Sequence, residues 1–394
     1  MSGLNQIVAV TWLNLRNLPQ RLGSSVVAVI GVAAVVLVFA AVLSMAKGFE
    51  RTMIAAGSDD TAIIMRSGST SELNSGFSNE QVLIVADAPG VLKDGDTTMM
   101  SAELYVIVDV KKKTSNTDAN VPFRGVQPGA FDVRNGVRLV EGRLFEEGKN
   151  EILVGRSAQQ EFVGLETGTS VQFGQTTWDV VGVFEANGSV SESELWTDVR
   201  VLQGSYRRGN SFQSVRVRLQ SPDSIETLRT ALEEDPRIDP DVMTEREYYS
   251  SQAEPLSRFI RLIGYPLTIL MSIGAIFGAL NSMYSSVSVR GKEIATLRAL
   301  GFGPLSVLVS TMVESTLLAL IGGLIGGAIA FLVFNGFQVS TLGASFSQVV
   351  FDFAVTPELL IDGLKAALII GVVGGLFPAI RAARLPVAQA LREL

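Results

Sequence analysis

A short segment near the middle of the C-terminal half combines charged side chains with an apolar stripe. Ile294, Leu297 and Leu300 recur at helical spacing beside bases and an acid, and glycines at 301 and 303 end the pattern. Such a helix packs against its own chain or docks on a partner, and the pattern alone leaves both open. The residues it offers for docking are Arg290, Lys292, Glu293, Ile294, Leu297, Arg298 and Gly301.

Several kinds of catalysis are excluded by composition. The chain has no cysteine and no histidine, so cysteine nucleophiles, Ser-His-Asp triads and the usual zinc sites are absent. No G-x-x-x-x-G-K-[ST] phosphate loop occurs, and the nearest fragments, at 148–150 and 291–293, lack the glycine spacing and the hydroxyl that binds magnesium. The acids Glu314 and Asp362 fall near opposite membrane faces, which disfavours an intramembrane enzyme.

The charged residues are distributed very unevenly, which indicates two solvents. Of 71 charged residues, 53 lie in the 210 residues from Gly48 to Ser257, although the mean hydropathy of the chain is positive. A soluble domain does not segregate charge in this way, whereas a membrane protein with one large extramembrane domain does. We therefore expect an α-helical membrane protein with four transmembrane helices and a large α+β extracytoplasmic domain inserted between helices one and two.

The uncharged runs set the expected boundaries. The first, 25 residues between Arg21 and Lys47, exceeds the apolar core of a signal peptide, so we expect an uncleaved anchor; Ser44-Met45-Ala46 keeps a cleavage site as the alternative. The predicted segments are an interfacial helix at 1–21, transmembrane helices at 22–46, 258–289, 305–334 and 358–380, a large domain outside the membrane at 47–257, a short amphipathic segment at 290–304, a loop at 335–357 on the side of the large domain and a tail at 381–394.

Small residues in the third span predict close helix packing. Gly322, Gly323, Gly326 and Gly327 stack at intervals of four, which lets helix backbones approach closely in lipid. Residues 4–18 place Leu4, Trp12 and other apolar residues at near-helical spacing. This pattern suits a helix on the inner leaflet, and an extension of the first span is the alternative.

Basic residues in short loops and tails predict the orientation, because they favour the cytoplasmic side. Both termini are expected inside and residues 48–257 outside. The bases on the expected inner side are Arg16, Arg21, Arg290, Lys292, Arg298, Arg381, Arg384 and Arg392.

The charged middle segment predicts an α+β domain. Alternation indicates strands at 62–66, 103–110, 151–154, 177–184 and 215–219, and the last is followed by a helix that presents Ile225, Leu228 and Leu232 on one face. The polar stretch SGSTSELNSGFSN, from Ser67, predicts a surface loop, and Lys111-Lys112-Lys113 precedes an expected hairpin tip.

Several stretches together resemble the FtsX-like permease domain, a family that includes the permeases of MacB-type ABC transporters. They are Arg290-x-Lys-Glu-Ile-Ala-Thr-Leu-Arg-Ala-Leu-Gly301, Glu314 before a glycine-rich span, and the terminal PAIRAARLPVAQALREL. The charged domain is similar to the MacB-like periplasmic core domain in FRGVQPGAF, LVEGRLFEEGKNEILVG, VVGVFEANGSVSESELWTD and EREYYSSQAEPLSRFI.

The resemblance implies a permease in the bacterial inner membrane that relays ATP hydrolysis to its outer domains by mechanotransmission, for export. It also implies a homodimer, two separate ABC ATPase subunits that bind the ATP and Mg, a periplasmic adaptor and contact with membrane lipid, with no cofactor in this chain and no nucleic acid partner. The alternatives are a lipoprotein-releasing permease, a regulator of cell-wall hydrolases and a passive membrane receptor.

Overall fold

The computed structural model describes residues 3–18, 22–343 and 347–386, and the chain divides into two compact units. The helical unit takes the chain up to Lys47, Phe259–Phe337 and the chain from Phe353 onward. The sheet unit takes Gly48–Arg258 and Gln338–Asp352.

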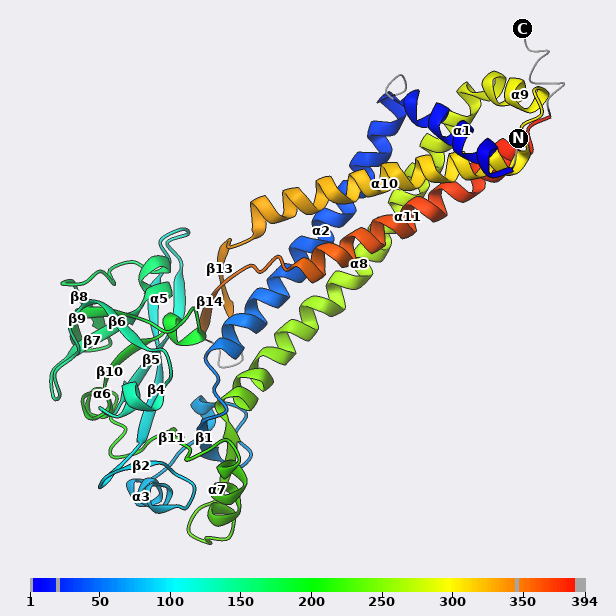
Figure 1. Ribbon diagram of the computed structural model, residues 1–394. Helices are drawn as coiled ribbons and strands as arrows, with labels where there is room; N and C mark the ends of the chain where they lie inside the picture. Colours follow the sequence, from blue (N-terminus) through cyan, green and yellow to red (C-terminus); the bar gives the residue numbers. More distant parts are fainter. Residues whose placement is uncertain (1–2, 19–21, 344–346, 387–394) are drawn as a thin grey trace. The chain divides into compact units, whose positions relative to one another are not determined.

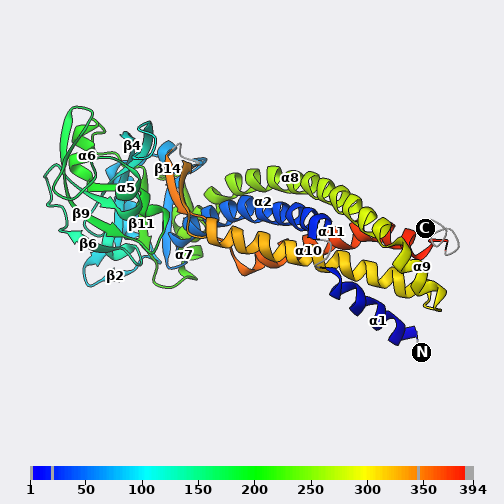
Figure 2. The same cartoon turned by 90° about the horizontal axis from the view of Figure 1, so that it is seen from above.

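Long helices that lie side by side form the helical unit (Figures 1 and 2). The described residues contain four helices long and apolar enough to cross a membrane. The helices are α1 (Gly3–Arg16), α2 (Leu22–Ala55), α8 (Glu245–Val289), α9 (Gly291–Ala299), α10 (Pro304–Phe334) and α11 (Pro357–Ala383). The short helix α1 is separate from α2 and buries Val10 and Asn14, so it is no simple extension of the first span.

Helices α2 and α8 are longer than the predicted spans of 22–46 and 258–289. Helix α2 continues to Ala55 and α8 begins at Glu245, because their additional turns bury apolar side chains within the sheet unit. Phe49 is fully buried in an edge-to-face contact with Phe351, and Tyr248 and Tyr249 are buried at the start of α8.

The predicted glycine stack lies where α10 meets its neighbours. A Cβ atom on Gly322 would lie 2.7 Å from the carbonyl oxygen of Val29, and one on Gly326 would lie 2.3 Å from that of Ala33. Both carbonyls belong to α2, so any larger residue at these positions would separate the two helices.

The next face of α10 meets α11 in the same way. A Cβ atom on Gly323 would lie 2.8 Å from the Cβ atom of Ala367, and Gly327 also faces α11. Helix α11 contributes Gly371, where a Cβ atom would lie 2.6 Å from that of Ala319, a contact that the sequence analysis did not single out.

A mixed sheet of ten strands in the described residues forms the second unit, in the order β12-β1-β11-β4-β5-β10-β7-β9-β6 with β8 paired to β9. Its strands are β1 (Thr61–Arg66), β4 (Met100–Lys111), β5 (Asp118–Val126), β6 (Arg138–Gly142), β7 (Glu151–Gly155), β8 (Ser170–Phe173), β9 (Thr176–Glu185), β10 (Leu195–Asp198), β11 (Ser214–Arg218) and β12 (Pro240–Thr244). The unit's other elements are β2 (Lys93–Asp94), β3 (Thr97–Thr98), α3 (Asn79–Asp87), α4 (Ala130–Val133), α5 (Arg156–Glu161), α6 (Val199–Ser205), α7 (Ser224–Glu233) and the 3-10 turns η2 (Glu72–Asn74) and η3 (Val190–Ser193).

The five alternating segments predicted as strands correspond to β1, β4, β7, β9 and β11. The predicted helix corresponds to α7, which buries Leu228 and Leu232. The predicted periplasmic loop at 335–357 differs, because it contains a hairpin of β13 (Gln338–Leu342) and β14 (Gln348–Asp352). Val350 on β14 joins the apolar core of the sheet unit, and its amide donates to the hydroxyl of Ser193 at 3.0 Å. Core burial therefore holds strand β14 against the sheet unit.

Candidate functional site

The segment predicted to couple with a partner is helix α9 and its flanks. The ends of α8, α10 and α11 gather around it within the helical unit (Figure 2). Arg290 precedes the helix, and Gly301 follows with a φ of 93°, a left-handed conformation that glycine adopts without strain. The glycines that the sequence pattern places at the end of the helix therefore agree with its C-terminal end.

Arg290 lies inside the unit instead of on its surface. Its Nη1 atom donates to Oε2 of Glu314 at 3.2 Å, and the amide of Asn14 donates to the same oxygen at 2.7 Å. Ser286 donates more weakly to the other oxygen, at 3.4 Å. Arg290, Glu314 and Asn14 are at most 3% exposed, so one buried carboxylate joins α1, the end of α8 and α10.

Two further predicted residues hold α9 in place. Ile294 is 1% exposed and packs with Val287, Val307 and Ala382. Arg298 donates from Nη1 to the carbonyl oxygen of Ala383 at 2.8 Å and to that of Leu385 at 3.2 Å, where the end of α11 leaves carbonyls without helical partners. Arg290, Ile294 and Arg298 thus make contacts within their own chain.

The remaining face of α9 is accessible. Lys292, Thr296 and Leu300 recur at intervals of four and are exposed, Leu300 by 72%. Glu293 and Leu297 are partly buried, and Nε of Arg290 lies 3.4 Å from Oε2 of Glu293. The accessible surface therefore differs from the predicted set: it adds Thr296 and Leu300, which the interval of four could have indicated.

Parts of the predicted inner surface fall outside the described residues. These are Arg21 and Arg392, together with positions 387–394 of the terminal motif and tail.

The sheet unit contains a buried cluster of charges that the sequence analysis missed. Three arginines on or beside β4, β5 and β11 meet four glutamates, all at most 7% exposed. We refer to these residues as the charge cluster: Arg124, Arg134, Arg216, Glu72, Glu103, Glu194 and Glu245.

Arg124 lies at the centre of the charge cluster. Its Nε and Nη2 atoms donate to the two carboxylate oxygens of Glu194 at 2.8 and 2.7 Å, a bidentate pair. Its Nη1 atom donates to Glu72 at 2.7 Å and to Glu103 at 2.9 Å. The guanidinium also lies 4.9 Å from the centre of the Tyr105 ring.

Arg216 connects the same acids to the start of α8. Its Nη1 atom donates to Glu103 at 2.6 Å and to Glu72 at 2.8 Å, and its Nε atom donates to Glu245 at 2.9 Å. Burial alone would raise the pKa of Glu103, but the arginines, Arg134 foremost, outweigh it and lower that pKa to about 2. Burial raises the pKa of Glu245, against the opposing effect of Arg216.

Glu72 is an exception within the stretch from Ser67 that is predicted as a surface loop, most of which is exposed. Glu72 is 3% exposed, and its neighbours Ser71 and Ser75 are also buried. Burial would raise its pKa, but Arg124 and Arg216 hold the pKa well below the usual range. A short polar stretch folds inward here because two buried arginines require a carboxylate.

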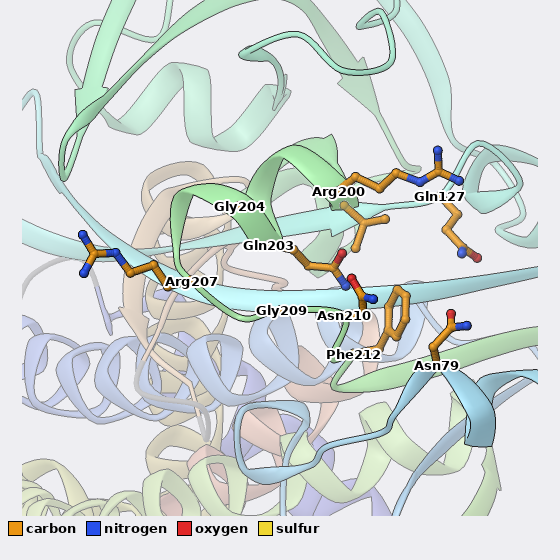
Figure 3. Close-up of a pocket in the computed structure, with 10 residues that line it drawn as sticks. Asn79, Gln127, Arg200, Gln203, Gly204, Arg207, Gly209, Asn210 and Phe212 are labelled. Carbon is orange, nitrogen blue, oxygen red and sulfur yellow. The ribbon is translucent and has the colours of Figure 1, made fainter.

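A polar cleft of about 560 Å³ in the sheet unit lies beside α6 (Figure 3). The amides of Asn79, Gln127, Gln203 and Asn210 line it with Arg200 and Arg207 and the ring of Phe212. Gln203 donates to the carbonyl oxygen of Ser211 at 2.9 Å, so part of this polarity holds the loop itself. The described lining residues include no carboxylate, so the cleft offers hydrogen bonds to a ligand but no acid–base pair.

Comparison with known families decides what these two units are. The model of the MacB-like periplasmic core domain matches residues 25–235, and that of the FtsX-like permease C-terminal domain matches residues 267–387. The chain belongs to the FtsX-like permeases with a MacB-like periplasmic core domain. The resemblance seen in the sequence is thereby confirmed, and this permease is a membrane-embedded subunit of an ABC transporter with a periplasmic domain.

Individual relatives are distant. The permease is 24% identical to the uncharacterized ABC transporter permease YknZ of Bacillus subtilis, and the match covers 92% of each chain. It is also 24% identical to the macrolide export ATP-binding/permease protein MacB of Burkholderia lata, but spans 56% of that protein and 98% of its own length. A crystal structure of the periplasmic region of MacB from Actinobacillus actinomycetemcomitans covers 49% of this chain, with 16% identity and a TM-score of 0.38.

Proposed function

We propose that this permease works as a homodimer in the bacterial inner membrane, with both termini in the cytoplasm and the sheet unit outside. Separate ATPase subunits bind the ATP and Mg, dock at α9, and drive movements of the sheet units that extrude a substrate, with a periplasmic adaptor as the outer partner. The family shown by the sequence supports an ABC transporter in general; the coupling by α9 is our inference.

The observation that carries this proposal is the two-sided character of α9. One side is fixed to the helical unit by Arg290, Ile294 and Arg298, and the other exposes Lys292, Thr296 and Leu300. A force applied to the exposed side reaches α10 through Glu314 and α11 through the carbonyl of Ala383. Such a relay requires no catalytic group in this chain.

Replacing Leu300 with aspartate should weaken ATPase binding by about tenfold to a hundredfold. The reason is that burying this leucine against the ATPase subunit would contribute about 1.5–3 kcal/mol to binding. Leu144→Asp is the matched control, since Leu144 is 48% exposed in the sheet unit. Binding would be measured by titrating the ATPase subunit onto permease in nanodiscs. The permease without that subunit should hydrolyse no ATP. Equal affinities for Leu300→Asp, Glu293→Lys and the parent would contradict docking at α9.

The orientation can be tested with single cysteines, since the chain has none. A cysteine at Ser115 should react with an impermeant maleimide on intact spheroplasts, whereas cysteines at Ser288 or at position 388, which lies outside the described residues, should react only after permeabilisation. If the cysteine at position 115 reacted only after permeabilisation, the proposed topology would be wrong.

A further inference from the structure

A second cleft, of about 580 Å³, lies in the helical unit where the ends of α8, α9 and α11 meet. Its walls come from three segments that are adjacent in both views (Figures 1 and 2). The residues that line it are Asn281, Tyr284, Ser285, Val287, Ser288, Val289, Gly291, Lys292, Arg381, Leu385 and Pro386.

The lining of this cleft is suited to an anion. Lys292 on α9 and Arg381 on α11 are exposed cations, and the guanidinium of Arg381 lies 5.5 Å from the centre of the Tyr284 ring, which orients it. Asn281 and Ser285 add neutral hydrogen-bond donors. The described lining residues include no carboxylate, so the two positive charges are not neutralised from within the cleft.

The face of α8 that leads to the cleft is apolar. Leu270, Ile273 and Phe277 are 67%, 46% and 66% exposed, and they continue at helical spacing into Asn281 and Ser288. One stripe of α8 therefore changes from apolar to polar at the end of the span. An apolar surface that ends in a polar cleft matches an amphiphile. Its acyl chain would lie along the apolar face of α8, and its phosphate would enter the cleft.

We propose that the cleft binds the headgroup of an anionic phospholipid of the inner leaflet. Basic pockets between transmembrane helices at the cytoplasmic side are suited to such headgroups, and each nearby lysine or arginine adds to the attraction. Free phosphate is also an anion but would leave the apolar stripe of α8 unused. Lipid in this cleft would contact α8, α9 and α11 together, so it would stabilise α9 in its observed position.

The test is native mass spectrometry of the full-length permease released from detergent, titrated with phosphatidylglycerol, phosphatidylcholine or inorganic phosphate. The Lys292→Gln/Arg381→Gln variant should bind phosphatidylglycerol about 25-fold more weakly, about fivefold for each cation at about 1 kcal/mol. The matched control is Arg16→Gln/Arg384→Gln, which removes two exposed bases that do not line the cleft and should leave this affinity within twofold.

A second variant separates the shape of the cleft from its charge. Ser285→Trp fills the cleft and keeps both cations, and it should abolish the preference for phosphatidylglycerol over phosphatidylcholine. Equal losses in the test and control pairs would overturn the proposal, and so would inorganic phosphate that binds as tightly as the lipid. Displacement of the lipid by the ATPase subunit would assign the cleft to that protein instead. Because the titration uses the permease alone, a failure of ATPase docking leaves its result unaffected.

Discussion

Replacing Arg216 with leucine is expected to lower the unfolding free energy of the sheet unit by about 3–5 kcal/mol, since breaking a buried ion pair leaves uncompensated charge in the core. The change would remove the contacts that Arg216 makes with Glu72, Glu103 and Glu245. These carboxylates would then remain buried with fewer positive partners. The cost should exceed that of most single substitutions, which destabilise by about 0.5–3 kcal/mol.

The matched control is Arg218→Leu, two positions further along the same strand. Arg218 donates to the carbonyl oxygen of Asp132 at 3.2 Å near the surface, and its loss should cost less than about 1 kcal/mol. Urea unfolding can be followed by the fluorescence of Trp178 and Trp196, which are fully buried in the sheet unit, with Trp12 replaced by phenylalanine throughout. Similar losses in both variants would show that the charge cluster contributes no more than a surface arginine.

Acid titration gives a second measurement on the same variant. The folded-state pKa of Glu103 is about 2, compared with 4.5 for the free side chain, so its ionisation contributes stability above pH 4.5 that is lost as the pH falls towards 2. Glu72 contributes in the same direction. Glu245, whose pKa is raised, opposes them, because its contribution is lost as the pH rises. Arg216→Leu should therefore flatten the loss of stability below pH 4.5.

Features that depend on neighbouring residues could be predicted from the sequence. The spans follow from uncharged runs long enough for a bilayer, and β11 follows from the alternation of Val215 and Val217 with arginines. The glycines of α10 mark close helix contacts because spacing by four places Gly322 and Gly326 on one face and Gly323 and Gly327 on the next. These patterns are local, so they need no knowledge of the tertiary structure.

The charge cluster and the Glu314 contacts could not be predicted, because their partners are distant in the chain. Arg216 and Glu72 are 144 positions apart, and Glu314 and Asn14 are 300 apart. Composition favours a surface position for such residues, since burial of an unpaired charge is costly. Their partners reverse that preference, and no local pattern shows that the partners will meet. Arg290 is a further example. The sequence predicts it as a docking residue, but its pairing with the distant Glu314 allows it to be buried in the structure.

Replacing Glu314 with leucine should release α9 from the helical unit. Arg290 would lose its closest buried anion, and the expected cost is about 3–5 kcal/mol. Asn14 on α1 would lose its acceptor in the same step. Because α9 is attached to α10 through this carboxylate, we expect its opening to become at least about a hundredfold more frequent, which corresponds to about 3 kcal/mol.

A cysteine at Ala295 reports this opening, since Ala295 is 1% exposed on α9 and the chain has no other cysteine. In inside-out vesicles the labelling rate should rise about a hundredfold with Glu314→Leu and remain unchanged with the control Glu358→Leu, an exposed acid in the first turn of α11. The double variant Glu314→Leu/Arg290→Leu should restore slow labelling, because it replaces the ion pair with apolar groups. Fast labelling in the double variant would show that α9 depends on the carboxylate itself, through Asn14 or Ser286, and not on its pairing with Arg290.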